Sequence, residues 1–164
     1  MDAVFDTVSV KQLVNCISRD SLTTSIDAFL RERILQLRVD ADGALIDEWA
    51  RSCGLTIIQP LVSQWNDWGA VVVTRPVTKL PTPVRGKLRK LGFTQTIDKL
   101  VLRIALASTD KRVVSEDSDF WDPADVKSPG NHRAVVATIC RDCLGITVLI
   151  LSMLIAELEG SETR

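Results

Sequence analysis

The chain has 164 residues, of which 46% are hydrophobic and 25% are charged, and its formal net charge is −1. This length suits one domain with a substantial core and is short for two, and the composition is that of an ordinary globular protein. A net charge so close to zero excludes a global attraction to nucleic acid, so any such contact has to come from a local patch.

The sequence predicts a cytoplasmic protein with no membrane partner. Its N-terminus lacks the basic segment and following apolar segment of a secretory signal. The longest apolar run, residues 144–156, is about 13 residues long and includes Thr147 and Ser152. Because a helix needs roughly 20 apolar residues to cross a bilayer, we expect this run to form a buried strand and then a buried helix.

Hydrophobic periodicity predicts strands and helices that alternate through the first half of the chain. The expected elements, in order, are a strand at 3–5, a helix from Asp6 through Ile17, a helix at 23–33, a strand at 34–39, a helix at 44–53, a helix at 57–68 and a strand at 70–73. The tight turn at Asp42–Gly43 and the stop at Gly54 support these boundaries.

The second half begins with a segment that has no acidic residue between Gly69 and Ile97 but contains six cations, Arg75, Lys79, Arg85, Lys87, Arg89 and Lys90. Its three prolines predict a loop, followed by a short basic helix at 84–91. The next elements are a helix from Thr94 or Thr96 to Ser108, a strand ending at Val114, a loop with Pro123 and Ser128–Pro129–Gly130, a helix at 132–144 and a strand at 146–149. A terminal helix to Leu158 and a frayed tail complete the chain.

This alternation predicts an α/β fold, with a central, mostly parallel sheet and helices on both faces. No repeat, low-complexity segment or domain boundary interrupts the pattern. We therefore expect a single domain over residues 1–160 and a frayed tail over 161–164.

Cys140 and Cys143 form a Cys-x-x-Cys pair that could bind zinc or undergo redox chemistry. Zinc needs four ligands, and only His132, expected in a loop, lies nearby in the sequence. Both cysteines fall within an apolar pattern at helical spacing, so core packing is the favoured interpretation.

The most unusual stretch is Val113-Val114-Ser115-Glu116-Asp117-Ser118-Asp119-Phe120-Trp121. Its acids follow a short buried strand and therefore fall at the carboxyl end of the sheet, where open α/β folds bind ligands. Two carboxylates 4 Å apart repel by about 1 kcal/mol in water and about 4 kcal/mol at an intermediate dielectric. Either these acids point apart into solvent, or a divalent cation neutralises them.

Other acids have simple structural interpretations when each is taken alone. Asp6 could cap the helix that it precedes, and Asp98 could complement a helix dipole, an effect of about 0.3–1 kcal/mol. Glu48 could face solvent beside Asp47.

Together, the acidic motifs resemble the PIN domain, a family of metal-dependent nucleases that mostly act on RNA. The resemblance covers nearly the whole chain and rests on Phe5-Asp6-Thr7, Asp47-Glu48-Trp49, Ile97-Asp98-Lys99-Leu100 and the segment from Val114 to Phe120. It implies a PIN-like α/β nuclease domain in which Asp6, Glu48, Asp98 and Asp117 are the catalytic acids, with Asp47 as the alternative to Glu48.

The resemblance also implies that Asp6, Asp98 and Asp117, with Asp119 beside them, bind one or two Mg²⁺ or Mn²⁺ ions. Such hard cations prefer carboxylate oxygens and promote hydrolysis of phosphodiesters. Single-stranded RNA is the expected substrate, and Ser115, beside the acids in the same motif, is expected to contact it. The resemblance also implies that the chain could be the toxin of a toxin–antitoxin pair, with an antitoxin protein as its partner, and could form a homodimer, as many members of the family do.

The basic segment gives RNA a second line of support. Its cations, of which Arg85, Lys87, Arg89 and Lys90 fall on the expected helix, would contact phosphates and draw a polyanion toward an acidic site. A solvated face of a loop and helix is an equally good interpretation of the same residues.

Two other functional readings stay open. Family members often carry Asn two residues after the first Asp, where this chain has Val8, and this departure favours a catalytically inactive PIN-like module that binds RNA or protein. A receiver-like domain with an acidic cation pocket ranks last, because no lysine falls clearly at the end of a second strand.

Overall fold

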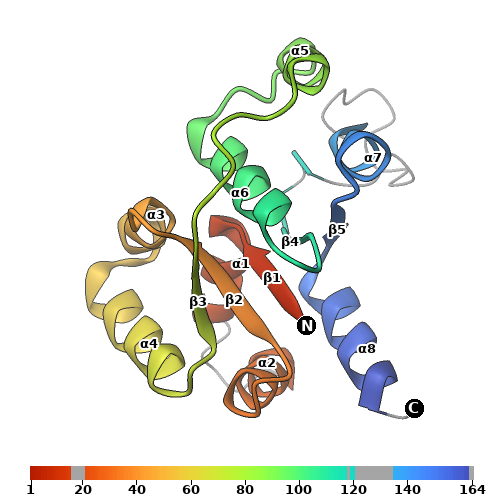
Figure 1. Ribbon diagram of the computed structural model, residues 1–164. Coiled ribbons are helices and arrows are strands. Elements are labelled where there is room, and N and C mark those ends of the chain that lie inside the picture. Colours follow the sequence, from red (N-terminus) through yellow and green to blue (C-terminus); the bar gives the residue numbers. More distant parts are fainter. Residues whose placement is uncertain (16–20, 118, 121–134, 163–164) are drawn as a thin grey trace.

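The computed structural model describes residues 1–15, 21–117, 119–120 and 135–162. Five strands form a single sheet in the order β3-β2-β1-β4-β5, and every pair of neighbouring strands is parallel (Figure 1). The strands are β1 (Asp2–Phe5), β2 (Gln36–Asp40), β3 (Val71–Thr74), β4 (Arg112–Val114) and β5 (Thr147–Leu149). Because helices flank this parallel sheet on both faces, the predicted α/β class is confirmed.

The helices of the first half follow the predicted order and include α1 (Thr7–Asn15), α2 (Ser21–Arg31), α3 (Ala44–Cys53) and α4 (Leu55–Asp67). After β3 come α5 (Thr82–Lys90) and α6 (Thr96–Ala107), and the last part contains α7 (Val136–Ile139), the π-helical turn η2 (Cys140–Leu144) and α8 (Leu151–Glu162). No described helix combines the length and the apolar character that a bilayer-spanning helix requires.

The core lies between the sheet and its covering helices. All four residues of β1 are buried, which is expected for the middle strand of a sheet covered on both faces. Helix α6 packs on β1, β2 and β4 and buries Leu102, Ile104 and Ala105 against them. This packing fixes where the first turn of α6 lies relative to the strand ends.

The strand order creates a switch point between β1 and β4. From β1 the chain proceeds through β2 to β3 on one side, then crosses through α5 and α6 to β4 and β5 on the other side. In parallel α/β sheets such a reversal opens a crevice at the carboxyl ends of the two central strands. Because Phe5 pairs with Val114, the residues that follow, Asp6 and Ser115, emerge side by side at this crevice.

Some predicted boundaries change in the structure. The helix predicted at 132–144 is described only as α7 and η2, and α8 extends to Glu162, two residues into the tail predicted to fray. The core packing predicted for the cysteine pair is confirmed for Cys140, which is buried, while Cys143 is exposed. The following predicted positions lie outside the described residues: Ile17, Trp121, Pro123, Ser128–Pro129–Gly130, His132 and residues 163–164.

Candidate active site

Asp6 lies at the carboxyl end of β1, where the strand turns into α1. Its Oδ1 accepts a hydrogen bond from the backbone N–H of Ser9 at 2.8 Å, so Asp6 caps the helix as one of the sequence interpretations predicted. Its Oδ2 accepts a short hydrogen bond from the hydroxyl of Ser115. The carboxylate is therefore held in one orientation by groups from two neighbouring strand ends.

Two buried serines connect the segments that follow β1 and β4. Ser9 Oγ donates to the carbonyl of Val114 at 3.0 Å and accepts from the N–H of Glu116 at 3.1 Å. Ser115 Oγ, besides donating to Asp6, accepts from the N–H of Asp117 at 3.0 Å. Because Ser115 is only 1% exposed and its hydroxyl joins Asp6 to the segment after β4, it positions the acids, and its predicted contact with substrate stays a prediction.

The three acids after β4 point to different partners. Glu116 Oε1 accepts the N–H of Leu151 at 2.8 Å and so holds the start of α8. Asp117 Oδ1 accepts the N–H of Asp119 at 2.9 Å, which keeps these two residues in one tight turn. The turn is anchored by buried Phe120, whose ring packs edge-on against Phe93 with centroids 5.0 Å apart.

Asp98 brings the third segment of chain to this crevice from the first turn of α6. Its pKa is raised from 3.8 to about 7, first by burial and then by the negative charges of Asp117, Asp119 and Asp6. Adjacent Lys99 opposes these effects only in part. Carboxylates from the beginning, middle and later third of the sequence thus lie close enough to repel one another.

The same environment acts on Asp6. Burial raises its pKa from 3.8 to about 6, against the lowering effect of its hydrogen bonds with Ser115 and Ser9, and the charge of Asp117 raises it further. Desolvation disfavours the ionised form of a carboxyl group, and a nearby cation would favour it.

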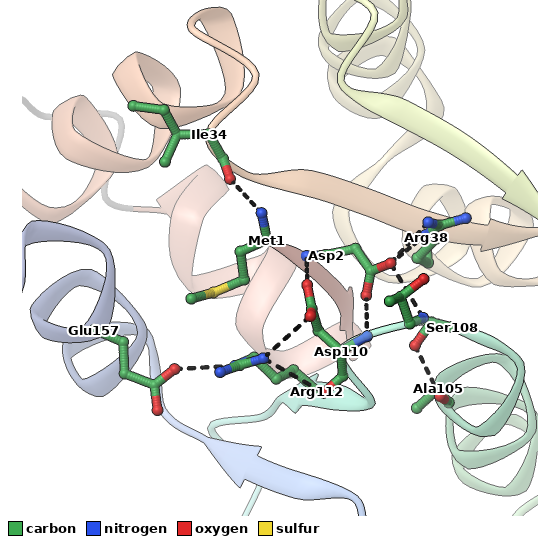
Figure 2. A network of polar contacts seen from close by, with 10 residues as sticks. Met1, Asp2, Ile34, Arg38, Ala105, Ser108, Asp110, Arg112 and Glu157 are labelled. Atoms are coloured by element: carbon green, nitrogen blue, oxygen red, sulfur yellow. Dashed lines mark hydrogen bonds and ion pairs between the residues drawn. The ribbon is translucent and has the colours of Figure 1, made fainter. Parts of the chain in front are cut away.

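At the amino ends of the strands, opposite the crevice, an arginine neutralises a buried carboxylate that has a structural role. Figure 2 shows Asp2, at the amino end of β1, facing Arg38 from β2, whose Nη2 lies 2.7 Å from Asp2 Oδ2. Asp2 also accepts the N–H groups of Thr109 and Asp110, and Arg112 continues the network to Glu157 on α8. Among the described residues, neither Asp6 nor Asp98 has an ion-pair partner of this kind.

The described carboxylates at the carboxyl edge do not form a closed set of metal ligands. Within the described ranges, no three Asp, Glu, His or Cys side chains are close enough together to hold an ion. Each carboxylate oxygen has two lone-pair positions, so Asp6 retains acceptor capacity beyond its two hydrogen bonds. All the acids at this edge offer oxygen, the ligand atom that Mg²⁺ and Mn²⁺ prefer.

Glu48, the predicted second acid, is placed differently. It lies on α3, where it pairs with Arg51 at 2.9 Å and accepts a hydrogen bond from Ser52, both on its own helix. Helix α3 packs beside α6, and among the described residues no hydrogen bond or ion pair joins Glu48 to Asp6, Asp98 or Asp117. Asp47, the alternative, is exposed.

Sequence reasoning missed two buried polar residues near these strand ends. Asp40 ends β2 and accepts the N–H groups of Ala44 and Leu45 at 2.9 and 2.8 Å, so its carboxylate holds the start of α3. Ser9 was also missed, although its position three residues after Asp6 is one where capping partners occur. The hydroxyl of Thr7 is buried and has no hydrogen-bond partner among the described residues.

The predicted substrate-binding cations divide between two faces of α5. Arg85 and Arg89 line a groove that α5 forms with α6 and the loop before it. Lys87 instead lies 3.5 Å from Cys143 Sγ, and Lys90 is exposed outside this groove. All four are solvent-exposed, but only Arg85 and Arg89 line this groove.

Comparisons with protein-family models, with curated proteins and with solved structures found no match to this chain.

Proposed function

We propose that this protein is a divalent-metal-dependent endoribonuclease that hydrolyses phosphodiester bonds at the carboxyl edge of its sheet. The observation that carries the proposal is the convergence of Asp6, Asp98 and Asp117 at the β1–β4 switch point, without the arginine that neutralises Asp2 at the opposite edge. Ligands of open α/β sheets bind at this position.

The residues at this edge offer the oxygen ligands that a hard divalent cation prefers, although within the described ranges they are not gathered closely enough to hold one without moving. Asp6, Asp98 and Asp117 would hold it, with Asp119 beside them, through carboxylate oxygens whose mutual repulsion the ion would relieve. When bound, such an ion acts as a Lewis acid on the scissile phosphate. The buried hydroxyl of Thr7 adds a donor without a partner next to Asp6.

The chain's own groups keep these acids in place. Ser115 and Ser9 fix the Asp6 carboxylate and tie it to the segment after β4, so the two strand ends cannot separate without breaking buried hydrogen bonds. Lys99, beside Asp98, supplies positive charge where an incoming phosphate would otherwise meet only acids. Glu48 is not given a role in this site.

Cleavage of a labelled, unstructured RNA in Mn²⁺ tests the proposal. We expect Asp98→Asn and Asp117→Asn each to reduce the rate by at least about 100-fold, which corresponds to about 2.7 kcal/mol of transition-state free energy. Asp67→Asn, an exposed acid at the end of α4, is the matched control and should cut like wild type. Equal cleavage by all four proteins would rule out these acids as the catalytic groups.

A second candidate function is an RNA-binding module without catalysis. It is favoured by the incomplete grouping of acids in the described residues and by Val8, which is 37% exposed beside the site. Titration calorimetry with Mn²⁺ separates the two candidates. A nuclease site should bind the ion and lose it in Asp6→Asn, whereas the silent module should release no specific heat of binding in either protein.

A further inference from the structure

The clearest basic surface of the molecule is a groove between the loop after β3, helix α5 and helix α6. In Figure 1, α5 stands at the top, away from the sheet, with α6 below it. The groove has a volume of about 590 Å³. The described residues that line it include five cations and no acid, and we call it the basic groove: Lys79, Arg85, Arg89, Lys99 and Arg103.

Among the described residues, no ion pair with a carboxylate neutralises the cations of the basic groove. Arg103 Nε donates to the carbonyl of Val77, and Lys99 Nζ donates to the carbonyl of Thr94 at 2.6 Å. Arg85 Nη2 donates to the hydroxyl of Thr82 at 3.0 Å. Across the described parts of the chain, none of the five cations has a carboxylate within ion-pair distance. Neutral partners therefore orient these side chains and leave their charge available to an anion.

The chemistry of the lining favours a sugar–phosphate backbone. Threonine hydroxyls at positions 78, 82, 94 and 96 stand among the cations and can donate to phosphate oxygens, as Ser and Thr commonly do in nucleic-acid complexes. Among the described residues that line the groove, none is an aromatic side chain on which a base could stack. Binding here should consequently be electrostatic and largely independent of base sequence.

The basic groove adjoins the acidic crevice through α6. Thr96 and Lys99 line the groove, and Asp98 lies between them in the first turn of the same helix. A polyanion held in the groove would therefore lie within one helical turn of an acid that we assign to the nuclease site.

We propose that the basic groove binds the backbone of single-stranded RNA without a divalent ion and presents it to the Asp98 end of α6. The choice of RNA over an acidic peptide rests on the proposed nuclease function. RNA binding in the groove does not require nuclease activity, because it depends on the cations of the groove, whereas cleavage is assigned to the carboxylates of the crevice.

Helix α5 offers a matched pair of double variants. Arg85→Gln with Arg89→Gln removes two cations that line the groove, and Lys87→Gln with Lys90→Gln removes two from the same helix that do not. Both variants lower the net charge equally, and all four side chains are exposed, so neither should disturb the core. Thermal unfolding of each variant checks this point.

Fluorescence anisotropy with a labelled, unstructured RNA in excess EDTA measures binding while preventing metal-dependent cleavage. We expect the Arg85/Arg89 variant to bind at least about 10-fold more weakly and to reduce the slope of log affinity against log salt by about 1.4, since each lost phosphate contact on a single strand contributes about 0.7. The Lys87/Lys90 variant should bind within about 3-fold of wild type.

Two outcomes would overturn the proposal. Equal losses in both variants would mean that only net charge matters, and stronger competition by polyglutamate than by unlabelled RNA of equal charge would assign the groove to an acidic protein segment. Failure of the nuclease proposal is distinguishable, because wild type would then leave RNA uncut in Mn²⁺, or Asp98→Asn and Asp117→Asn would cut like wild type, whatever the binding in EDTA.

Discussion

At the residue scale, Ser115 shows how one buried hydroxyl organises a cluster of like charges. It donates to Asp6 and accepts from the N–H of Asp117, so it connects two acids that otherwise repel each other. The sequence motif predicted that Ser115 belongs near the acids. Its orientation toward Asp6 followed only from the β1–β4 register, which the sequence does not specify.

We predict that Ser115→Ala lowers the free energy of unfolding by about 1–3 kcal/mol, because a buried carboxylate and a buried N–H both lose a partner. Urea unfolding at pH 7 measures the change. Ser108→Ala is the control, because Ser108 is also buried but donates only to the carbonyl of Ala105 in the preceding turn. Equal losses in the two variants would show that Ser115 has no special place in the cluster.

Asp98 should make the metal-free protein less stable as the pH rises. The carboxyl group ionises near 3.8 in the unfolded chain and only at about 7 in the folded protein. Between these values the folded state binds more protons, so the free energy of unfolding falls with increasing pH and levels off above about 7. Allowing for the partial exposure of Asp98, we expect a loss of about 1–2 kcal/mol.

Urea unfolding in EDTA at pH 4.5, 6 and 8 tests this dependence. Asp98→Asn cannot ionise, so its unfolding free energy should decline less than that of wild type over the same interval. The prediction fails if wild type and Asp98→Asn show parallel curves.

At the scale of elements, neighbouring acids after β4 serve different helices and strands. Glu116 accepts the first N–H of α8, whereas Asp117 remains with Asp119 and Asp98 at the crevice. We predict that Glu116→Ala costs about 1 kcal/mol, as the loss of a helix-capping group does, and leaves Mn²⁺ binding unchanged. Asp117→Asn should show the reverse, with weakened Mn²⁺ binding and no loss of stability, because it removes a repelling charge.

Calorimetry and urea unfolding on both variants give the comparison. A loss of Mn²⁺ binding in Glu116→Ala, or a large loss of stability in Asp117→Asn, would contradict the division between the two residues.

The elements that the sequence predicted well are those with a strong periodic pattern. Helix α6 and strand β1 match because their apolar residues face one core and their ends carry clear signals. The separation of the α5 cations onto two faces of the helix also follows from the sequence, because Arg85 and Arg89 are four residues apart and therefore share one helical face. Glu48 could not be placed in this way, because its position depends on how α3 rotates against the sheet.

For the whole molecule, the alternation of strands and helices was enough to predict a parallel α/β fold. The order β3-β2-β1-β4-β5 was not predictable, because the reversal after β3 depends on long-range pairing of β4 with β1. That reversal decides which acids meet. The sequence also did not indicate the role of Asp40. This residue ends β2 beside the crevice, but both of its carboxylate oxygens accept hydrogen bonds from the start of α3.

Buried acids lie at both ends of β1, and we assign Asp2 at the amino end to stability and, under the proposed function, Asp6 at the carboxyl end to metal binding. Removing a charge at the amino end should therefore change only the free energy of unfolding. Arg38→Met leaves Asp2 buried at 3% exposure without its cation, although the N–H groups of Thr109 and Asp110 still bind it. We predict a loss of about 2–4 kcal/mol in the free energy of unfolding, near the lower end of the range for breaking a buried ion pair. Mn²⁺ affinity should stay within about 2-fold of wild type, because the network lies at the opposite end of β1 from Asp6.

Arg51→Met is the matched control for this last prediction. Its ion pair with Glu48 is nearly as short, 2.9 Å against 2.7 Å, but the arginine is 71% exposed, so its removal should cost less than about 0.5 kcal/mol. Urea unfolding and Mn²⁺ calorimetry on the two variants show whether the stability that an arginine–carboxylate ion pair contributes depends on its burial or only on its short distance. If Arg38→Met weakened Mn²⁺ binding as much as Asp6→Asn, the two edges would be coupled through β1, and the assignment of the amino edge to stability alone would be wrong.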